Sequence, residues 1–454
     1  MDMITKVWNA ALCRIDKNKG KSRFTDKAIG FLEGILLNNA ILSFAKGLSA
    51  VTVFKAASFM MSITVSVIIA RTLGPEATGT IGVVQTAANF LIIPMVMGVS
   101  ASASKYFPSA DETEKKEMMS TVLLMNVLLV IIFSFAYLSI SSLVTDTLKL
   151  IAEDLWQYSI VIAVIINLGC ITEGFMRGSK SFYQIGLYRF VSLAVFLLIV
   201  IWRVLVNKSI SMHHYFSAVC VYQMVFAILA FLHLRIRPTA FSHKYAVRLY
   251  RYGIATMFCW ALTSIVSGID IFMVKYFCSA RDVGIFSAYV LNAKTIFNLL
   301  FFDMFLIVFQ PTIADIDKTY LIQKLDKWTV VLFPAFITGA SFLTVLVILL
   351  FGSQFPLRPE YILFTALGMA LSGLCQLYGA IVAMEGNHGV RLCLISTALT
   401  TPVLAFIQYF CIRFNGIDGA VLSYAAIHLL NLIFFRLLIK YKFNKTARNK
   451  GFGG

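Results

Sequence analysis

Charge is scarce in this sequence: only 13% of the 454 residues are charged, while 59% are hydrophobic and the mean hydropathy is +0.82. A soluble domain carries about a quarter charged residues. The apolar excess runs along the whole chain and is not confined to one end. The composition therefore excludes an ordinary soluble fold and predicts an all-α polytopic membrane protein.

Signatures of catalysis and of metal binding are missing as well. The eight cysteines form no CxxC pair and mostly fall in apolar stretches, which is typical of cysteine used as a small apolar side chain. The P-loop, HExxH and GxSxG patterns are absent, and the pair His213–His214 has no carboxylate nearby in sequence. We therefore expect no metal, no cofactor and no enzymatic activity.

Apolar stretches long enough to cross a bilayer recur along the chain. A spanning helix needs roughly 20 apolar residues. Residues 28–45 are less apolar and contain Glu33 and Asn38, which predicts an interfacial amphipathic helix rather than a span. Twelve stretches qualify as spans: about 48–70, 81–104, 118–144, 154–176, 183–206, 213–234, 252–278, 284–311, 326–351, 359–384, 390–413 and 418–440.

Basic residues are distributed unequally among the connections. With the N-terminus inside, the cytoplasmic segments hold about 28 of the 39 Lys and Arg, and the external connections hold about 8. This asymmetry explains the net charge of +17 as a topology signal, so no nucleic-acid partner is expected. We expect both termini to be cytoplasmic and the number of spans to be even.

A basic connection at 235–251 divides the predicted spans into two sets of six. The resulting organisation is a basic cytoplasmic N-terminal segment with an interfacial helix (1–47), an N-lobe (48–234), this basic cytoplasmic linker, a C-lobe (252–440) and a basic cytoplasmic tail (441–454). Six spans per lobe give both lobes the same orientation. Parallel repeats about an axis along the membrane normal are therefore expected, with a site between the lobes.

Short matches between the two lobes support an internal repeat. MRGSK at Met176–Lys180 and MEGNH at Met384–His388 each follow the fourth span of a lobe. Gly79 and Gly284 each follow the first span, at nearly the same offset. The turn before Gly79 contains Leu-Gly-Pro-Glu, in which Gly and Pro end one helix. We assign a structural role in this turn to Gly74, Pro75, Gly79 and Gly284.

Charged side chains inside spans are costly in lipid and usually face the protein interior or water. Three cations, Lys55, Arg189 and Lys294, lie within predicted spans. Lys55 and Arg189 either face a cavity or extend to the interface along their aliphatic stems, whereas Lys294 is too deep to do so easily. A mildly cationic cavity would suit a phosphate or pyrophosphate, so we predict that these three bind the substrate.

Two carboxylates, Asp270 and Asp303, also lie well inside predicted spans, away from their ends. Asp270 is either a proton-titrating group that couples transport to an ion or a partner of Lys275 or Lys294. Asp303 is rotated to the face opposite Lys294 in an ideal helix, so we expect it to neutralise a cation on another helix.

Uncharged polar residues mark the predicted inner surfaces of both lobes. Ser58, Ser62 and Ser66 share one face of the first span, and either wet a cavity or pack against another helix. Each further residue of this kind is more often an interhelical hydrogen bond than a ligand contact. The weaker cavity-lining candidates are Gln85, Asn89, Gln223, Asn298, Gln376, His428 and Asn431.

Several short motifs resemble those of a known family. The first is ARTLGPEATG at Ala70–Gly79, and Gly268-Ile269-Asp270 follows in the seventh predicted span. These two motifs and three later ones occur in one order between about residues 45 and 440. Their sequences and their order resemble those of the polysaccharide transport family. This family includes Wzx-type O-antigen flippases of the multidrug/oligosaccharidyl-lipid/polysaccharide exporter superfamily. The later motifs are DVGIFSAY at Asp282–Tyr289, FQPTIADI at Phe309–Ile316 and NGIDGAVLSY at Asn415–Tyr424.

The resemblance implies a function and a fold. Such proteins move polyprenyl-pyrophosphate-linked oligosaccharides, for O-antigen, capsule or a similar polymer of lipopolysaccharide or surface glycan, to the outer leaflet of the bacterial inner membrane. Two MATE-like lobes open alternately, and basic cavity residues hold the pyrophosphate and sugar. Lys55, Arg189 and Lys294 lie in compatible places. The implied partners are the lipid-linked oligosaccharide, a glycan polymerase and chain-length regulator in the membrane, and a coupling proton or sodium ion.

Three alternatives remain open at this point. A multidrug or cation antiporter of the same superfamily is disfavoured by the excess of cations within spans. A membrane enzyme of glycan assembly would need a catalytic group on a sizeable external loop, and no connection is long enough. A scaffold for glycosyltransferases would move no lipid-linked glycan.

Overall fold

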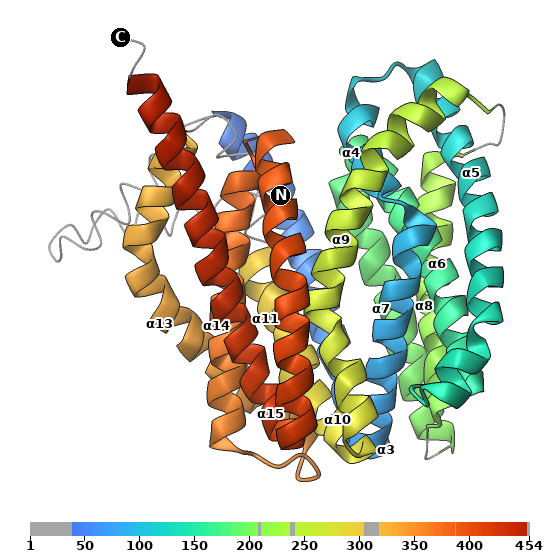
Figure 1. Cartoon of the computed structure of the whole chain (residues 1–454). Coiled ribbons are helices and arrows are strands. Elements are labelled where there is room, and N and C mark those ends of the chain that lie inside the picture. Colours follow the sequence, from blue (N-terminus) through green and yellow to red (C-terminus); the bar gives the residue numbers. More distant parts are fainter. Residues whose placement is uncertain (1–38, 208–209, 237–240, 304–316, 386, 452–454) are drawn as a thin grey trace, which may run out of the picture. The chain divides into compact units, whose positions relative to one another are not determined.

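A computed structural model describes residues 39–207, 210–236, 241–303, 317–385 and 387–451, and these form helices joined by short turns, without a strand (Figure 1). The chain divides into two units, Met1–Val53 and Phe54–Gly454. The contacts described below belong to the second unit. The predicted interfacial helix at 28–45 falls mostly outside the described residues.

The first helices, α3 to α8, form the N-terminal group. Helix α3 contains a non-helical residue, Gly74, with φ 78° and ψ −176°. Helices α6, α7 and α8 pack together, and α4 packs on α6 (Figure 1). The elements are α3 Asn39–Val96, α4 Val99–Tyr106, η1 Phe107–Ser109, α5 Glu112–Ser139, η2 Leu143–Thr147, α6 Glu153–Gly178, α7 Phe182–Asn207 and α8 Met212–Leu234.

The remaining helices, α9 to α15, form the C-terminal group. Helix α15 is interrupted at Gly416, with φ 55°. Helix α14 packs between α13 and α15, and α9 contacts both α15 and α4 (Figure 1). The elements are α9 His243–Phe277, α10 Ala280–Phe286, η3 Ser287–Asn292, α11 Ala293–Asn298, η4 Leu299–Asp303, α13 Lys318–Phe351, α14 Pro359–Ala383 and α15 Asn387–Gly451.

Ten of the described helices are long and apolar enough to cross a membrane, so the chain is a multi-pass membrane protein. Two of the ten, in α3 and α15, run through the interruptions at Gly74 and Gly416. The predicted stretch 48–70 and most of 81–104 therefore fall in α3, whereas the last residues of the second stretch belong to α4. The stretches 390–413 and 418–440 both fall in α15. The count of twelve spans stays a prediction.

The basic linker differs from the expected simple connection. We expected the seventh span to begin near residue 252, but α9 begins at His243. Its first turns are helical because they bury an apolar face: Tyr245 and Leu249 pack in one cluster with residues of α4, α5 and α6. The Ser102 hydroxyl donates to the Leu249 carbonyl at 2.7 Å, which joins this start of α9 to α4.

The eighth predicted span, at 284–311, is also less regular than expected. It begins as α10 and then alternates with two π-helical segments, η3 and η4. Each π-type turn adds a residue per hydrogen-bonded ring and rotates the following side chains. Residues 304–316, which include the end of this span and the motif at Phe309–Ile316, lie outside the described part of the chain.

Close backbone contacts join the two groups at the turn that holds Gly74, here named the Gly74 end. A β-carbon at Gly284 would lie 1.8 Å from the carbonyl oxygen of Pro75, and one at Gly79 would lie 2.6 Å from the Gly284 nitrogen. Only glycine permits this approach. Arg71 Nε also donates to the Leu350 carbonyl at 2.7 Å. The two glycines that the sequence aligns as repeat equivalents therefore touch each other.

Candidate functional site

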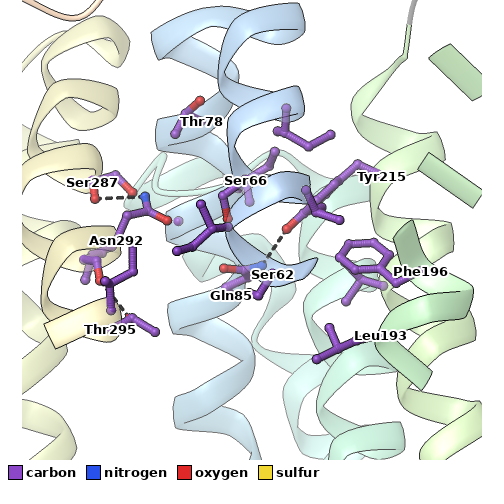
Figure 2. A pocket seen from close by; sticks show the side chains of 18 of the residues that line it. Ser62, Ser66, Thr78, Gln85, Leu193, Phe196, Tyr215, Ser287, Asn292 and Thr295 are labelled. Atoms are coloured by element: carbon purple, nitrogen blue, oxygen red, sulfur yellow. Dashed lines mark hydrogen bonds between the residues drawn. The ribbon is translucent and has the colours of Figure 1, made fainter. Parts of the chain in front are cut away.

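A cavity of about 460 Å³ lies between the N-terminal group and the segment η3–α11. In Figure 2, Ser62 and Ser66 of α3 lie between Ser287 and Asn292 on one side and Tyr215 on the other. The volume falls within the range of about 300–1,000 Å³ that is usual for small-molecule sites. The hydrogen-bonding residues of its lining are Ser58, Ser62, Ser66, Thr78, Gln85, Thr86, Asn89, Tyr215, Tyr222, Gln223, Ser287, Asn292 and Thr295.

The floor of the cavity is formed where α3 meets η3. Thr78 and Gly82 of α3 belong to the lining, and so does Phe351 at the end of α13. A β-carbon at Gly82 would lie 2.6 Å from the Ser287 hydroxyl, so the two segments leave no space between them there. The contacts of the Gly74 end lie on this side and close the cavity.

Two hydrogen bonds fix amide groups on opposite walls (Figure 2). Gln85 Nε2 donates to the Tyr215 hydroxyl at 2.8 Å, and Asn292 Nδ2 donates to the Ser287 carbonyl at 3.1 Å. The Ser58 hydroxyl is buried and has no hydrogen-bond partner among the described residues. Buried polar groups are normally hydrogen-bonded, so this hydroxyl offers an unused donor and acceptor.

An aromatic and amide wall connects the cavity to a partly buried ion pair behind it. The rings of Phe196 and Tyr222 stack with centroids 4.7 Å apart. Gln223 Nε2 donates to the Tyr222 hydroxyl at 2.7 Å, and Arg189 Nη1 donates to Gln223 Oε1 at 3.3 Å. Arg189 Nη2 lies 2.8 Å from Glu173 Oε2, so its charge is compensated inside the protein.

Two further contacts hold this ion pair. The Arg189 guanidinium lies 3.7 Å from the centroid of the Phe226 ring, a cation–π arrangement. Arg177 on the same helix as Glu173 forms a second salt bridge to that carboxylate. Spacing within the sequence gives no sign of the contact between Glu173 and Arg189.

The three predicted substrate-binding cations do not line this cavity. Arg189 stands behind Gln223, and Lys294 faces the C-terminal group. Lys55 lies on α3 and is partly buried, and it is not among the lining residues. Contact between any of the three and a phosphate therefore stays a prediction. Gln85, Asn89 and Gln223 are the predicted polar residues that do belong to the lining.

The other predicted residues meet inside the C-terminal group. Asp270 of α9 and Lys294 of α11 interact electrostatically, and so do Lys294 and His428 of α15. Lys294 Nζ lies 5.8 Å from the centroid of the Tyr424 ring, and this ring contacts His428 edge-on at 4.8 Å. Asp270, Tyr424 and His428 are at most 5% exposed. We name Asp270, Lys294, Tyr424 and His428 the α15 cluster.

Hydrogen bonds between neighbouring helices surround the α15 cluster. Gln376 Nε2 of α14 donates to Asn298 Oδ1 of α11 at 3.3 Å. Asn431 Nδ2 donates to Cys375 Sγ at 3.6 Å, and its carbonyl oxygen accepts from Thr400 at 3.4 Å. These predicted residues therefore form the interhelical bonds that we weighed against cavity lining.

Asp303 ends η4, and its side chain lies outside what the structure describes. Within the described part of the chain, no group of three or more His, Cys, Asp or Glu side chains is arranged to hold a metal ion.

Sequence reasoning missed most of the aromatic wall. Tyr215 and Tyr222 lie in apolar spans and carry no pattern that separates them from core tyrosines. The spacing of Ser58, Ser62 and Ser66 was a usable signal, and of its two interpretations the structure confirms the one in which they line a cavity.

Comparisons with known proteins agree on the class of membrane protein. A family model described as "Polysaccharide biosynthesis protein" matches residues 44–317, more than half of the chain. No curated protein matches the chain. Three solved structures, each 14% identical to the chain, show the same fold.

The three structures are all transporters of the same architecture. Lipid II flippase MurJ in an inward closed conformation has a TM-score of 0.65, with 86% of this chain and 87% of MurJ covered. An inward-facing multidrug resistance MATE family transporter of the MOP superfamily has a TM-score of 0.62, with 85% and 95% covered. A MOP superfamily transporter from Pyrococcus furiosus, described by the reverse polarity of its binding pocket, has a TM-score of 0.56, with 87% and 96% covered.

Proposed function

This chain belongs to the polysaccharide biosynthesis protein family, and on that premise we propose that it is a flippase for a polyprenyl-pyrophosphate-linked oligosaccharide. It would move an O-antigen, capsule or similar repeat unit from the cytoplasmic to the outer leaflet of a bacterial inner membrane. The observation that carries the proposal is the 460 Å³ cavity lined by hydroxyl and amide groups within a membrane fold. Such a lining suits a sugar head group.

The proposed mechanism is alternating access by two lobes, 48–234 and 252–440, built as parallel repeats. The contact between Gly79 and Gly284 supports this arrangement, because equivalent residues of a two-fold repeat meet where its axis passes. The distribution of basic residues favours cytoplasmic termini, which would turn the Gly74 end outward. The cavity is closed at that end, so this conformation would receive its cargo from the inside.

Two further features belong to the proposal. Coupling to a proton or a sodium ion would act through Asp270, which is buried within α9 beside a cation. A glycan polymerase and a chain-length regulator would receive the translocated product in the same membrane. Contact between the diphosphate and Lys55, Arg189 or Lys294 would need a conformation in which these side chains reach the cavity.

Reconstitution of the full chain tests the function directly. Liposomes would contain a polyprenyl-diphosphate-linked trisaccharide in both leaflets, and membrane-impermeant periodate would oxidise only the sugars of the outer leaflet. We expect the protein to make the inner-leaflet pool accessible. A pool as protected as in protein-free liposomes would contradict the proposal and favour a scaffold, and efflux of a cationic dye without glycan movement would favour the multidrug antiporter.

A further inference from the structure

We propose that the cavity selects uncharged oligosaccharides and disfavours acidic ones, and that Arg189 positions its wall instead of binding the diphosphate. This inference rests on the proposed flippase function and specifies the class of head group. It predicts that sugars such as hexoses and their N-acetyl derivatives are accepted, whereas repeat units containing uronic acids are transported poorly.

The charge of the lining is the first argument. Among the described residues that line the cavity there is no Asp, Glu, Lys, Arg or His. A carboxylate moved from water into a membrane protein loses much of its hydration, and it needs a counter-charge to compensate. Sugar hydroxyls have no such requirement, because they exchange hydrogen bonds with water for hydrogen bonds with protein. A lining of this kind therefore separates the two classes of sugar.

Two of the predicted substrate-binding cations, Arg189 and Lys294, strengthen this argument. Arg189 and Glu173 lie behind Gln223, and the distance of 2.8 Å between Nη2 and Oε2 indicates mutual neutralisation. Lys294 is on the far side of its helix segment, where it interacts with Asp270 and lies over the Tyr424 ring. Arg189 is paired with a carboxylate, and Lys294 interacts with Asp270 away from the lining, so neither cation is placed to receive an anionic head group in this conformation.

The unused hydrogen-bonding capacity of the lining is the second argument. Gln85 donates one N–H to Tyr215, which leaves its other N–H and its carbonyl oxygen. Asn89, one turn further along α3, is exposed to the cavity and makes no hydrogen bond with a described residue. Ser58 adds a buried hydroxyl without a partner. These neutral donors and acceptors match the hydroxyl groups around a sugar ring.

The wall opposite α3 supplies an apolar surface for the same ligand. Phe196 and Tyr222 stack at 4.7 Å and both belong to the lining. The C–H face of a pyranose ring is apolar and packs well on an aromatic ring, and Tyr222, backed by the buried Phe196, is the partly exposed ring of this pair. Hydrogen bonds around the ring edge and contact with its face together describe a sugar site rather than a phosphate site.

Arg189 fixes one part of this wall through Gln223. Its Nη1 donates to Gln223 Oε1, which orients the amide so that Nε2 donates to the Tyr222 hydroxyl. The second Nε2 hydrogen is then available to a ligand. Arg189 is therefore a positioning residue, held in place by Glu173 and the Phe226 ring.

A matched pair of substrates tests the selection. Two polyprenyl-diphosphate-linked trisaccharides would be compared in proteoliposomes, one made of neutral hexoses and one in which a single hexose is replaced by its uronate. Both carry the same diphosphate and lipid, so only the sugar charge differs. We expect the neutral substrate to become accessible to periodate at least about tenfold faster. Equal rates, or a faster uronate, would overturn the selection while leaving the flippase function intact.

The outcome in which neither substrate moves overturns the flippase function, and this inference with it. A charge-gain variant gives a second readout: Asn89→Lys should raise the uronate rate severalfold and lower the neutral rate. The matched variant Asn89→Met should lower the neutral rate without raising the other. An unchanged ratio of rates in a folded Asn89→Lys protein would contradict the role of charge, and the comparison of substrates on the parent chain does not depend on this variant.

Discussion

The cavity and the α15 cluster are both polar, but they treat charge in opposite ways. The cavity exposes hydroxyl and amide groups to a space of about 460 Å³ and has no charged residue in its described lining. The α15 cluster gathers a carboxylate, an ammonium group and an imidazole that interact electrostatically, with Asp270 and His428 buried. The charged groups of this cluster interact with one another, whereas the described lining of the open space contains only neutral groups.

This difference follows from the cost of charge in a membrane. A buried ion that loses its partner destabilises the protein strongly, whereas a hydroxyl facing a cavity stays solvated until a ligand replaces its water. Arg189 lies between the neutral cavity and the charged interior. It donates to the lining residue Gln223 on one side and to the Glu173 carboxylate on the other. Variants in the cavity wall, in the Arg189–Glu173 pair and in the α15 cluster test whether charge and neutral lining are separated in this way.

The largest effect is expected for Arg189→Met. It leaves Glu173, whose side chain is 13% exposed, with only Arg177 as a partner. We expect a loss of about 3 kcal/mol in the free energy of unfolding, at the low end for a broken buried pair because Arg189 is 34% exposed. Denaturant unfolding of the purified chain in micelles would measure it. The double variant with Glu173→Gln should recover most of the loss.

One result for Arg189→Met would contradict the difference between a neutral cavity and internally paired charges. Normal stability of Arg189→Met together with abolished transport would mean that the guanidinium contacts the substrate directly. The cationic-cavity hypothesis would then regain support from the same measurement.

The next effect concerns the α15 cluster. In a double-mutant cycle, Asp270→Asn and Lys294→Met should show a coupling of about 2 kcal/mol, because the two opposite charges interact within the protein. Lys275→Met is the matched control, since Lys275 lies on α9 near Asp270 and has no electrostatic interaction with it that compares with that of Lys294. If Asp270 also couples an ion to transport, Asp270→Asn should remove the dependence of transport on the ion gradient. Retained dependence would assign the cluster to stability alone.

The sequence could predict the helices but not their pairing. Hydropathy located the apolar stretches, and the Leu-Gly-Pro-Glu motif located the turn at Gly74, because both signals are local. The partner of Arg189 depends on how α7 rotates against α6, which no spacing within one helix reveals. The expectation for Asp303 used ideal helical geometry, and the π-helical segments η3 and η4 remove that basis. The sequence therefore shows which residues within the spans are polar. It does not show which of them line the cavity and which belong to the α15 cluster.

The third effect, on transport, is expected for Gln223→Met. This change removes the amide that links Arg189 to Tyr222, so the wall loses its orientation and one donor. We expect a roughly tenfold slower flipping of a neutral lipid-linked trisaccharide, equivalent to about 1.4 kcal/mol in the barrier. Gln408→Met is the matched control, because Gln408 is a buried glutamine of α15 that does not line the cavity. Equal losses in both variants would show that the cavity wall has no special part in transport.

The smallest effect is expected for the hydrogen bond between Asn298 and Gln376, beside the α15 cluster. At 3.3 Å this bond is long, and interhelical side-chain bonds in membrane proteins contribute about 0.6 kcal/mol on average. A double-mutant cycle with Asn298→Ala and Gln376→Ala should therefore give a coupling of that size in unfolding measurements, and transport should change less than twofold. Asn298 lies on the segment that also supplies Thr295 to the cavity. A strong transport defect in Asn298→Ala with unchanged stability would mean that the substrate reaches this side of α11, and the separation between a neutral cavity and a charged, closed cluster would no longer hold.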